Sequence, residues 1–229
     1  MADVPNDGSG HRARLRKRLI EGGSEALLDH ELVEFLLGLS IKRRDTKALA
    51  KALIAEFGSF GALLSADPEA LGHARAGKLG ETTIAALMIA KASALRLLAS
   101  DVRNRPVLSN WQALLDYLHA DLAHQPIERV RVLHLDAKNV LIRDELVTEG
   151  SIDQAAVYVR EIIRRAIDLH ASSLILVHNH PSGDPSPSKA DIQLTREISE
   201  AARPLGITVH DHLIIGAKGQ SSLRSMGLI

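Results

Sequence analysis

The sequence contains no cysteine, and this absence excludes several kinds of chemistry. Without thiols the chain has neither disulfides nor thiolate ligands for zinc, which fits a reducing compartment. The chain also has no run of about eighteen apolar residues, the length that a membrane-spanning helix needs. The segment Met1–Asp7 lacks the apolar core of a secretory signal. We therefore expect a cytoplasmic protein that does not interact with a membrane.

The chain also lacks an excess of charge of either sign, because 28 basic and 28 acidic residues give a formal net charge of zero. No overall field therefore attracts nucleic acid or anionic lipid. Positive charge is nevertheless concentrated near the N-terminus, in His11, Arg12, Arg14, Arg16, Lys17 and Arg18. This basic cluster is consistent with contact to DNA phosphates and equally with the solvated start of a helix, and both interpretations stay open.

Apolar residues make up 45% of the 229 residues and charged residues 24%, which is typical of a soluble globular protein. This length allows one large domain or two small ones. Residues 1–10 are polar, and we expect them to be disordered. The helical spacing of apolar residues over 11–100 predicts a bundle of about five short helices. The polar segment 101–109 predicts a linker.

The remaining residues, 110–229, predict a mixed α/β domain in which helices cover a central sheet. Apolar residues alternate with polar ones in two segments, and the short apolar run 174–177 indicates a central strand that is buried on both faces. Strands are expected at 130–135, 140–147, 174–177, 207–209 and 213–215. Helices are expected from residue 110, over 153–170 and over 188–203.

The segment from His178 to Asp191, HNHPSGDPSPSKAD, carries the clearest chemistry. His178 and His180 follow the buried strand, and residues i and i+2 of an extended segment point to the same side. Asp191 lies in the first turn of the next helix, near enough to supply a third ligand. Two nitrogens and one oxygen without sulfur suit zinc best, with Mn²⁺ and Fe²⁺ as alternatives. Three protein ligands leave one coordination position open, as in catalytic sites.

A structural interpretation competes for the same residues. Ser188-Lys189-Ala190-Asp191 fits a capping box, with Ser188 as the N-cap residue and Asp191 reaching back to it. The two interpretations compete for the Asp191 carboxylate, whereas Ser188 could cap the helix in either case. A capping box gives no reason for His180, and this favours the metal site.

Hydrolysis at zinc also needs a carboxylate that accepts a proton from water. The upstream candidates are Glu128, Glu145, Glu149 and Glu161. Glu128 precedes the first strand, whereas Glu161 lies in a helix beside arginines, where a solvated ion pair is expected.

A second His-x-His triplet, His210-Asp211-His212, follows the motif. We expect it to support the site or the core from a neighbouring strand. A metal-bound imidazole needs an outer-shell partner, and Asp211 is the candidate for that contact.

The motif from His178 to Asp191 resembles the signature of the bacterial RadC (UPF0758) family. The C-terminal domain of that family is an MPN/JAMM module, similar to zinc-dependent deubiquitinating isopeptidases. Nearly the whole chain is covered, and further landmarks are Glu149-Gly150-Ser151, Tyr158-Val159-Arg160-Glu161 and Asp211-His212-Leu213-Ile214-Ile215-Gly216. The resemblance implies an N-terminal helical domain related to helix-hairpin-helix modules and a C-terminal, cytidine-deaminase-like α-β-α domain.

The family pattern also implies residue roles. His178, His180 and Asp191 would bind one zinc ion per chain, Ser188 would stabilise the oxyanion, and Glu128 would activate water. The sequence departs from the pattern at Asn179, where peptidases of this class carry Ser or Thr, and at Tyr158-Val159, where many relatives carry His-Pro. The turn Ala76-Gly77-Lys78-Leu79-Gly80 matches DNA-binding hairpins only loosely.

The resemblance implies a zinc metallopeptidase or isopeptidase that acts on a peptide or protein substrate. The alternative is a DNA-associated repair or recombination accessory protein, which would use the N-terminal helical region and the basic residues 11–18. A zinc deaminase is excluded, because that chemistry uses His-x-Glu together with Cys-x-x-Cys. Neither the substrate nor the oligomeric state follows from the sequence.

Overall fold

The computed structural model describes residues 9–42, 44–103, 105–150 and 159–229. Their contacts divide the chain into two units, one ending at Ser93 and the other beginning at Ala94. The predicted mixed α/β class is confirmed. Residues 1–8 of the segment predicted to be disordered lie outside the described residues. Ser9 and Gly10 open the first helix, so the prediction is wrong for them; the first helical turn tolerates such residues because its N–H groups have no intrahelical partners.

The N-terminal unit is helical, as predicted. Its elements are α1 (Ser9–Gly22), a 3₁₀ turn (Ser24–Ala26), α2 (Asp29–Ser40), α3 (Lys47–Phe57), α4 (Phe60–Ser65), α5 (Pro68–Gly72) and the first part of α6 (Glu81–Arg103). Side chains set the helix starts: the Asp67 carboxylate accepts the Ala70 amide at 2.8 Å, and Pro68 occupies the first position of α5. Buried leucines from α2 to α6 form the core of this unit.

α6 is longer than predicted and ends at Arg103, so residues 101–103 of the predicted linker are helical, and Val107–Ser109 form a 3₁₀ turn. Among the described residues, α6 is long and apolar enough to cross a membrane by length and composition, since an 18-residue window of it has a mean hydropathy of 1.5. Its Leu87 is nevertheless buried in the core of the N-terminal unit, and Lys91 Nζ donates to Ser65 Oγ at 3.0 Å. Only 11% of the apolar window of α6 is buried, so these contacts cover a small part of the helix.

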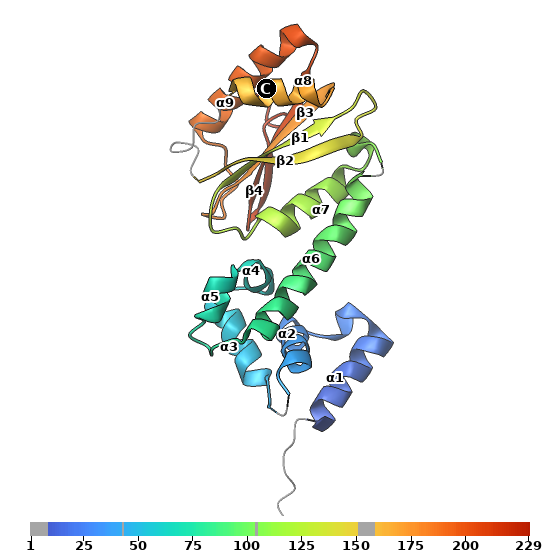
Figure 1. The fold of residues 1–229 in the computed structure, drawn as a ribbon, viewed down its shortest axis with the longest axis vertical. Helices are drawn as coiled ribbons and strands as arrows, with labels where there is room; N and C mark the ends of the chain where they lie inside the picture. Colours follow the sequence, from blue (N-terminus) through green and yellow to red (C-terminus); the bar gives the residue numbers. More distant parts are fainter. Residues whose placement is uncertain (1–8, 43, 104, 151–158) are drawn as a thin grey trace, which may run out of the picture. The chain divides into compact units, whose positions relative to one another are not determined.

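The C-terminal unit is a five-stranded sheet with helices on both faces (Figure 1). Its elements are α7 (Trp111–Leu122), β1 (Arg129–Leu135), β2 (Leu141–Glu149), α8 (Val159–Asp168), β3 (Ser173–Asn179), α9 (Lys189–Ala202), a 3₁₀ turn (Arg203–Leu205), β4 (Thr208–Gly216) and β5 (Gly219–Ser222). The strand order is β2-β1-β3-β4-β5, and only β3 and β4 run parallel among these neighbours.

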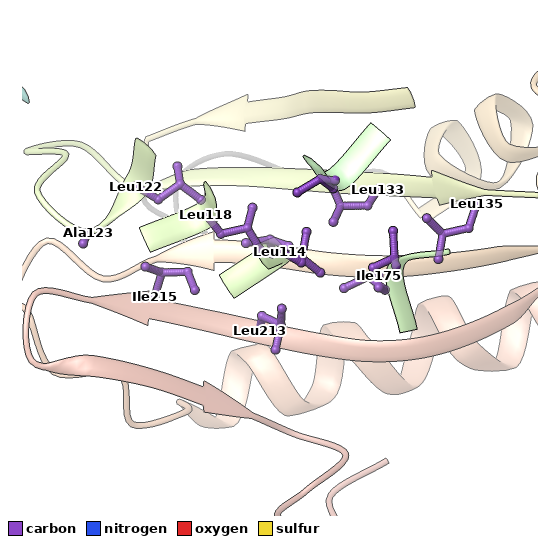
Figure 2. Packing of buried hydrophobic residues seen from close by; sticks show 12 residues of the cluster. Leu114, Leu118, Leu122, Ala123, Leu133, Leu135, Ile175, Leu213 and Ile215 are labelled. Carbon is purple, nitrogen blue, oxygen red and sulfur yellow. The ribbon is translucent and has the colours of Figure 1, made fainter. Parts of the chain in front are cut away.

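Two apolar layers cover the sheet. On one face, Leu114, Leu118 and Leu122 of α7 pack against β1, β3 and β4 (Figure 2). On the other face, α8 and α9 pack against the same strands, with Leu174 and Leu176 of β3 in the contact. Every residue of β3 is buried, as expected for the central strand.

Side chains of β3 alternate between these two layers. Ile175 and Val177 belong to the α7 layer, whereas Leu174 and Leu176 belong to the α8–α9 layer. By the same alternation, His178 faces the α8–α9 side and the following residue faces the α7 side. The strand therefore delivers neighbouring polar residues to opposite faces of the sheet.

The last part of the sheet differs from the prediction. The strands expected at 207–209 and 213–215 are one strand, β4, and the final strand is β5. The polar triplet 210–212 interrupts the apolar pattern but not the strand, because buried polar side chains there have hydrogen-bond partners. The helix predicted over 153–170 is present as α8; its expected start falls in residues 151–158, which lie outside the described residues together with the landmarks Ser151 and Tyr158.

Two isoleucines of α8 offer a matched test of this packing. Ile162 is 3% exposed within the α8–α9 layer, whereas Ile167 is 50% exposed. We expect Ile162→Ala to lower the free energy of unfolding by about 2–5 kcal/mol, because it removes buried methyl groups and leaves a cavity. Ile167→Ala should change it by no more than about 0.5 kcal/mol. Urea unfolding of both variants measures the difference, and equal losses would contradict the layer assignment.

Candidate metal centre

The two histidines of the motif meet at the carboxyl end of β3. His178 lies opposite Val130 of β1 and Ile214 of β4, so backbone pairing on both sides sets its position. His180 follows the strand, and the Nε2 atoms of His178 and His180 are 2.9 Å apart. The convergence expected for residues i and i+2 is therefore present.

A close approach of two backbone segments holds the loop that carries His180. The His180 amide donates a hydrogen bond to the Ile215 carbonyl at 2.9 Å. The backbone at Gly183 packs directly against Gly216, where an added Cβ would lie 2.5 Å from the Gly183 carbonyl oxygen, so position 216 requires glycine. The loop also orients the imidazole, because His180 Nδ1 lies 2.9 Å from the Asp184 carbonyl oxygen. Since a carbonyl only accepts, Nδ1 carries the hydrogen and the Nε2 lone pair of the neutral ring faces His178.

Asp191 makes its contacts through both carboxylate oxygens. Oδ2 accepts the Ser188 amide at 2.6 Å, and Ser188 Oγ accepts the Asp191 amide at 3.2 Å, which completes the predicted capping box at the start of α9. Oδ1 lies 3.2 Å from His178 Nε2, and Oδ2 lies 3.5 Å from His180 Nε2. The capping and metal-binding interpretations are therefore compatible, since Oδ1 stays directed at His178 while Oδ2 caps the helix.

Glu128 is the candidate proton acceptor that lies beside the histidines. Its carboxylate and the ring nitrogens of His178 and His180 form a possible metal-binding group, with the ligand atoms within 4.8 Å of one another. The other three glutamates form ion pairs with arginines: Glu145 with Arg165 at 2.8 Å, Glu149 with Arg129 at 2.8 Å and Glu161 with Arg164 at 3.0 Å. The geometry thus separates Glu128 from the other candidates.

Asn179 connects β3 to the segment that carries Glu128. Its Oδ1 accepts the Arg129 amide at 2.9 Å, and its Nδ2 donates to the Ile127 carbonyl at 3.1 Å. These two bonds flank Glu128 along the chain. The residue that departs from the peptidase pattern therefore holds the glutamate segment in place on the α7 side of the sheet.

The converging side chains create a point that requires positive charge. Burial, together with the neighbouring imidazoles, lowers the pKa of His178 well below its ordinary value, so this ring is neutral. Burial opposes ionisation of Asp191, but the contact with His180, the hydrogen bonds of the Ser188 cap and the nearby His178 hold its pKa below the usual range. The contact with Asp191 in turn raises the pKa of His180. Two nitrogen lone pairs and a carboxylate this close need a proton or a metal cation between them, and nitrogen and oxygen donors without sulfur fit zinc.

The second His-x-His triplet supports the site through a different residue than expected. His212 Nε2 lies 2.8 Å from His178 Nδ1, so the buried partner of this imidazole is His212 and the suggestion of Asp211 is wrong. The Asp211 carboxylate instead accepts from Ser222 Oγ at 2.6 Å and ties β4 to the end of β5. Burial lowers the pKa of His212 to about 4, so this imidazole is neutral at neutral pH.

Most of the basic cluster at residues 11–18 has partners within the N-terminal unit. His11 contacts Glu34 at 2.9 Å, Arg12 donates to the Ile41 and Arg44 carbonyls, Lys17 contacts Glu21 at 3.9 Å and Arg18 contacts Glu31 at 2.8 Å. Arg14 and Arg16 are exposed. Less of the positive charge is therefore available to phosphates than the sequence suggests, and DNA binding stays a prediction.

Two carboxylates border the histidines, and isosteric variants distinguish a ligand from a proton acceptor. We expect Asp191→Asn to lose its bound zinc and Glu128→Gln to keep about one zinc per chain, because an amide retains the shape but not the charge of a ligand. Elemental analysis after dialysis measures the metal, and circular dichroism checks that both variants fold. If Asp191→Asn retained zinc and Glu128→Gln lost it, Glu128 would be the ligand and Asp191 the proton acceptor.

Known proteins resemble this chain over nearly its whole length. Residues 108–228 match the profile of the RadC-like JAB domain. A UPF0758 protein from Rhodobacter capsulatus is 51% identical over 94% of this chain and 100% of its own length. A UPF0758 protein from Ruegeria pomeroyi is 49% identical over 99% of this chain and 100% of its own length. The predicted resemblance is confirmed, and the chain belongs to the UPF0758 family of proteins with a RadC-like JAB domain.

Proposed function

We propose that this protein is a metal-dependent hydrolase of the JAMM type that cleaves an amide bond in a peptide or protein. The observation that carries the proposal is the convergence of His178 Nε2, His180 Nε2 and the Asp191 carboxylate within 3.5 Å. Glu128 lies beside this point. Three ligands and a nearby carboxylate are the composition of a hydrolytic zinc site that keeps one coordination position open.

In this proposal His178, His180 and Asp191 hold one zinc ion per chain. When bound, zinc supplies a Lewis acid that makes water nucleophilic near neutral pH and polarises a carbonyl group. The protein contributes the fixed geometry: His178 comes from a strand paired on both sides, and Asp191 comes from a capped helix start. Ligands on such elements lose little conformational freedom when they bind an ion.

Glu128 and Ser188 would handle the proton and the developing charge. The Glu128 carboxylate accepts a proton from the attacking water and passes it to the leaving amine. Ser188 is exposed, and its Oγ already accepts the Asp191 amide, so its hydroxyl hydrogen is directed elsewhere. That hydrogen can donate to the carbonyl oxygen as it becomes negative.

The choice of an amide bond rests on membership of the JAB-domain family. The competing zinc chemistry on a related fold, deamination, uses thiolate ligands. The chain contains no cysteine, so its ligand set supports hydrolysis by a site of histidines and a carboxylate.

Incubation with a proteome-derived peptide library tests the activity directly. Zinc-loaded wild-type protein should generate new amino termini, detected by mass spectrometry, and Glu128→Gln should generate none because it has no proton acceptor. Ser188→Ala should cleave about 10²–10³-fold more slowly, the usual effect of removing one oxyanion donor.

Ser182→Ala is the matched control, because Ser182 is an exposed serine of the same loop whose Oγ only accepts the Asp184 amide at 3.3 Å. It should cleave at the wild-type rate. No cleavage by zinc-loaded wild-type protein, or full activity of Glu128→Gln, would contradict the proposal.

Asn179 offers a separate test of how Glu128 is positioned. We expect Asn179→Ala to keep its zinc, since the backbone of His178 is held by strand pairing. Its kcat on a peptide identified from the library should fall by up to about 100-fold, because displacement of a catalytic group by about 1 Å costs that much. Its KM should stay near the wild-type value. An unchanged kcat would show that the bonds to Arg129 and Ile127 do not position Glu128.

A further inference from the structure

A chain of buried hydrogen bonds runs from one histidine of the site, through β4, to α9. His178 Nδ1 lies 2.8 Å from His212 Nε2, and His212 Nδ1 lies 2.6 Å from Thr195 Oγ1. Thr195 Oγ1 lies 2.5 Å from the Asp191 carbonyl oxygen. His178, His212 and Thr195 are each 0% exposed. Water does not reach these side chains, so each hydrogen bond in the series must be formed between two of these four groups.

The acceptor at the end of the chain determines the direction of each bond. The Asp191 carbonyl oxygen can only accept, so the single hydroxyl hydrogen of Thr195 points to it. His212 Nδ1 must then bring its own hydrogen to Thr195 Oγ1. A neutral imidazole carries one hydrogen, so His212 Nε2 has none and accepts from His178 Nδ1. The one hydrogen of neutral His178 is thereby held on Nδ1.

We propose that Thr195 and His212 are positioning residues that select the tautomer of His178 and so keep its Nε2 lone pair directed at the site. This inference rests on the proposed function, because a nitrogen binds a metal only through a free lone pair. With the opposite tautomer, His178 would direct an N–H at His180 and Asp191, and its Nε2 could not act as a ligand.

Thr195 gives the sharper variant, since its side chain contacts neither histidine of the metal group and touches Asp191 only at the backbone carbonyl. Thr195→Val keeps the shape of the side chain but removes the acceptor for His212 Nδ1–H. A buried N–H without a partner is costly, so the hydrogen of His212 moves to Nε2 and the hydrogen of His178 is displaced to its own Nε2. Thr195→Ser restores the hydroxyl and should restore the original tautomers.

Nitrogen-15 NMR of the histidine rings in the metal-free full-length protein observes the tautomers directly. In wild-type protein and Thr195→Ser, both His178 and His212 should carry their hydrogen on Nδ1. In Thr195→Val both should carry it on Nε2. A wild-type His178 that carries its hydrogen on Nε2 would overturn the inference, and so would a Thr195→Val spectrum identical to that of the wild type.

Zinc affinity, measured by competition with a chelator, gives the second readout. Thr195→Val should bind zinc about 10–100-fold more weakly, the usual effect of losing an outer-shell partner, and Thr195→Ser should match the wild type. The control is Ser199→Ala, which removes a hydroxyl-to-carbonyl hydrogen bond of 2.7 Å one turn further along α9. This bond does not belong to the series from His178 to the Asp191 carbonyl. It should leave the affinity unchanged.

The two readouts separate failure of this inference from failure of the proposed function. If the wild-type protein binds no zinc, the proposed function fails, whereas the tautomers of the metal-free protein still decide the role of Thr195. If the wild-type protein binds zinc and Thr195→Val binds it equally tightly, the positioning role of Thr195 is overturned and the metal site stands.

Discussion

β3 is hydrogen-bonded to a neighbour on each side and buried on both faces, and the site is built outward from its carboxyl end. Its alternation directs His178 toward α9 and Asn179 toward α7. One strand therefore carries both a histidine of the site and the asparagine whose hydrogen bonds hold the Glu128 segment. A slip of one residue in register would exchange these two faces and place an imidazole and an amide where neither finds its partner. Because apolar layers cover both faces of the strand, such a slip would also disturb the core on both sides. The register that stabilises the core therefore also positions the polar groups.

The charge balance at the site follows from this burial. Two imidazoles and a carboxylate that converge away from water are costly unless a cation lies between them. Asp191 limits this cost, because its Oδ2 accepts the Ser188 amide at 2.6 Å at the start of α9. The same carboxylate offers Oδ1 to His178. A cation that binds only the folded chain would stabilise it further by mass action.

Local and distant parts of the site were predictable to very different degrees. The histidines and Asp191 occupy one strand, loop and helix start, where the spacing in the sequence itself determines which side chains converge. The sequence left Glu128 open among four glutamates, because its placement depends on the antiparallel register of β1 with β3, which pairs residues about fifty positions apart. For the second triplet, the choice between Asp211 and His212 depends on which face of β4 each occupies. The β3–β4 pairing has an irregularity between Leu174 and Ile175, and such a shift of register is invisible in the sequence.

The identity of the partner of His178 has an electrostatic consequence. A metal-binding histidine often donates to a carboxylate, which makes the ring more basic but adds a second negative charge. Here Asp191 already brings one carboxylate into a buried site, and another beside it would have to be desolvated without a partner of its own. The neutral path through His212 and Thr195 reaches a backbone carbonyl instead, and it adds no net charge. Asp191 and Glu128 already border the histidines, so a third carboxylate would offset more of the charge of a bound cation, and the neutral path avoids this. Asp211 is buried on the β5 side, where Ser222 and the Arg224 amide satisfy its carboxylate, so it adds no further negative charge beside the histidines.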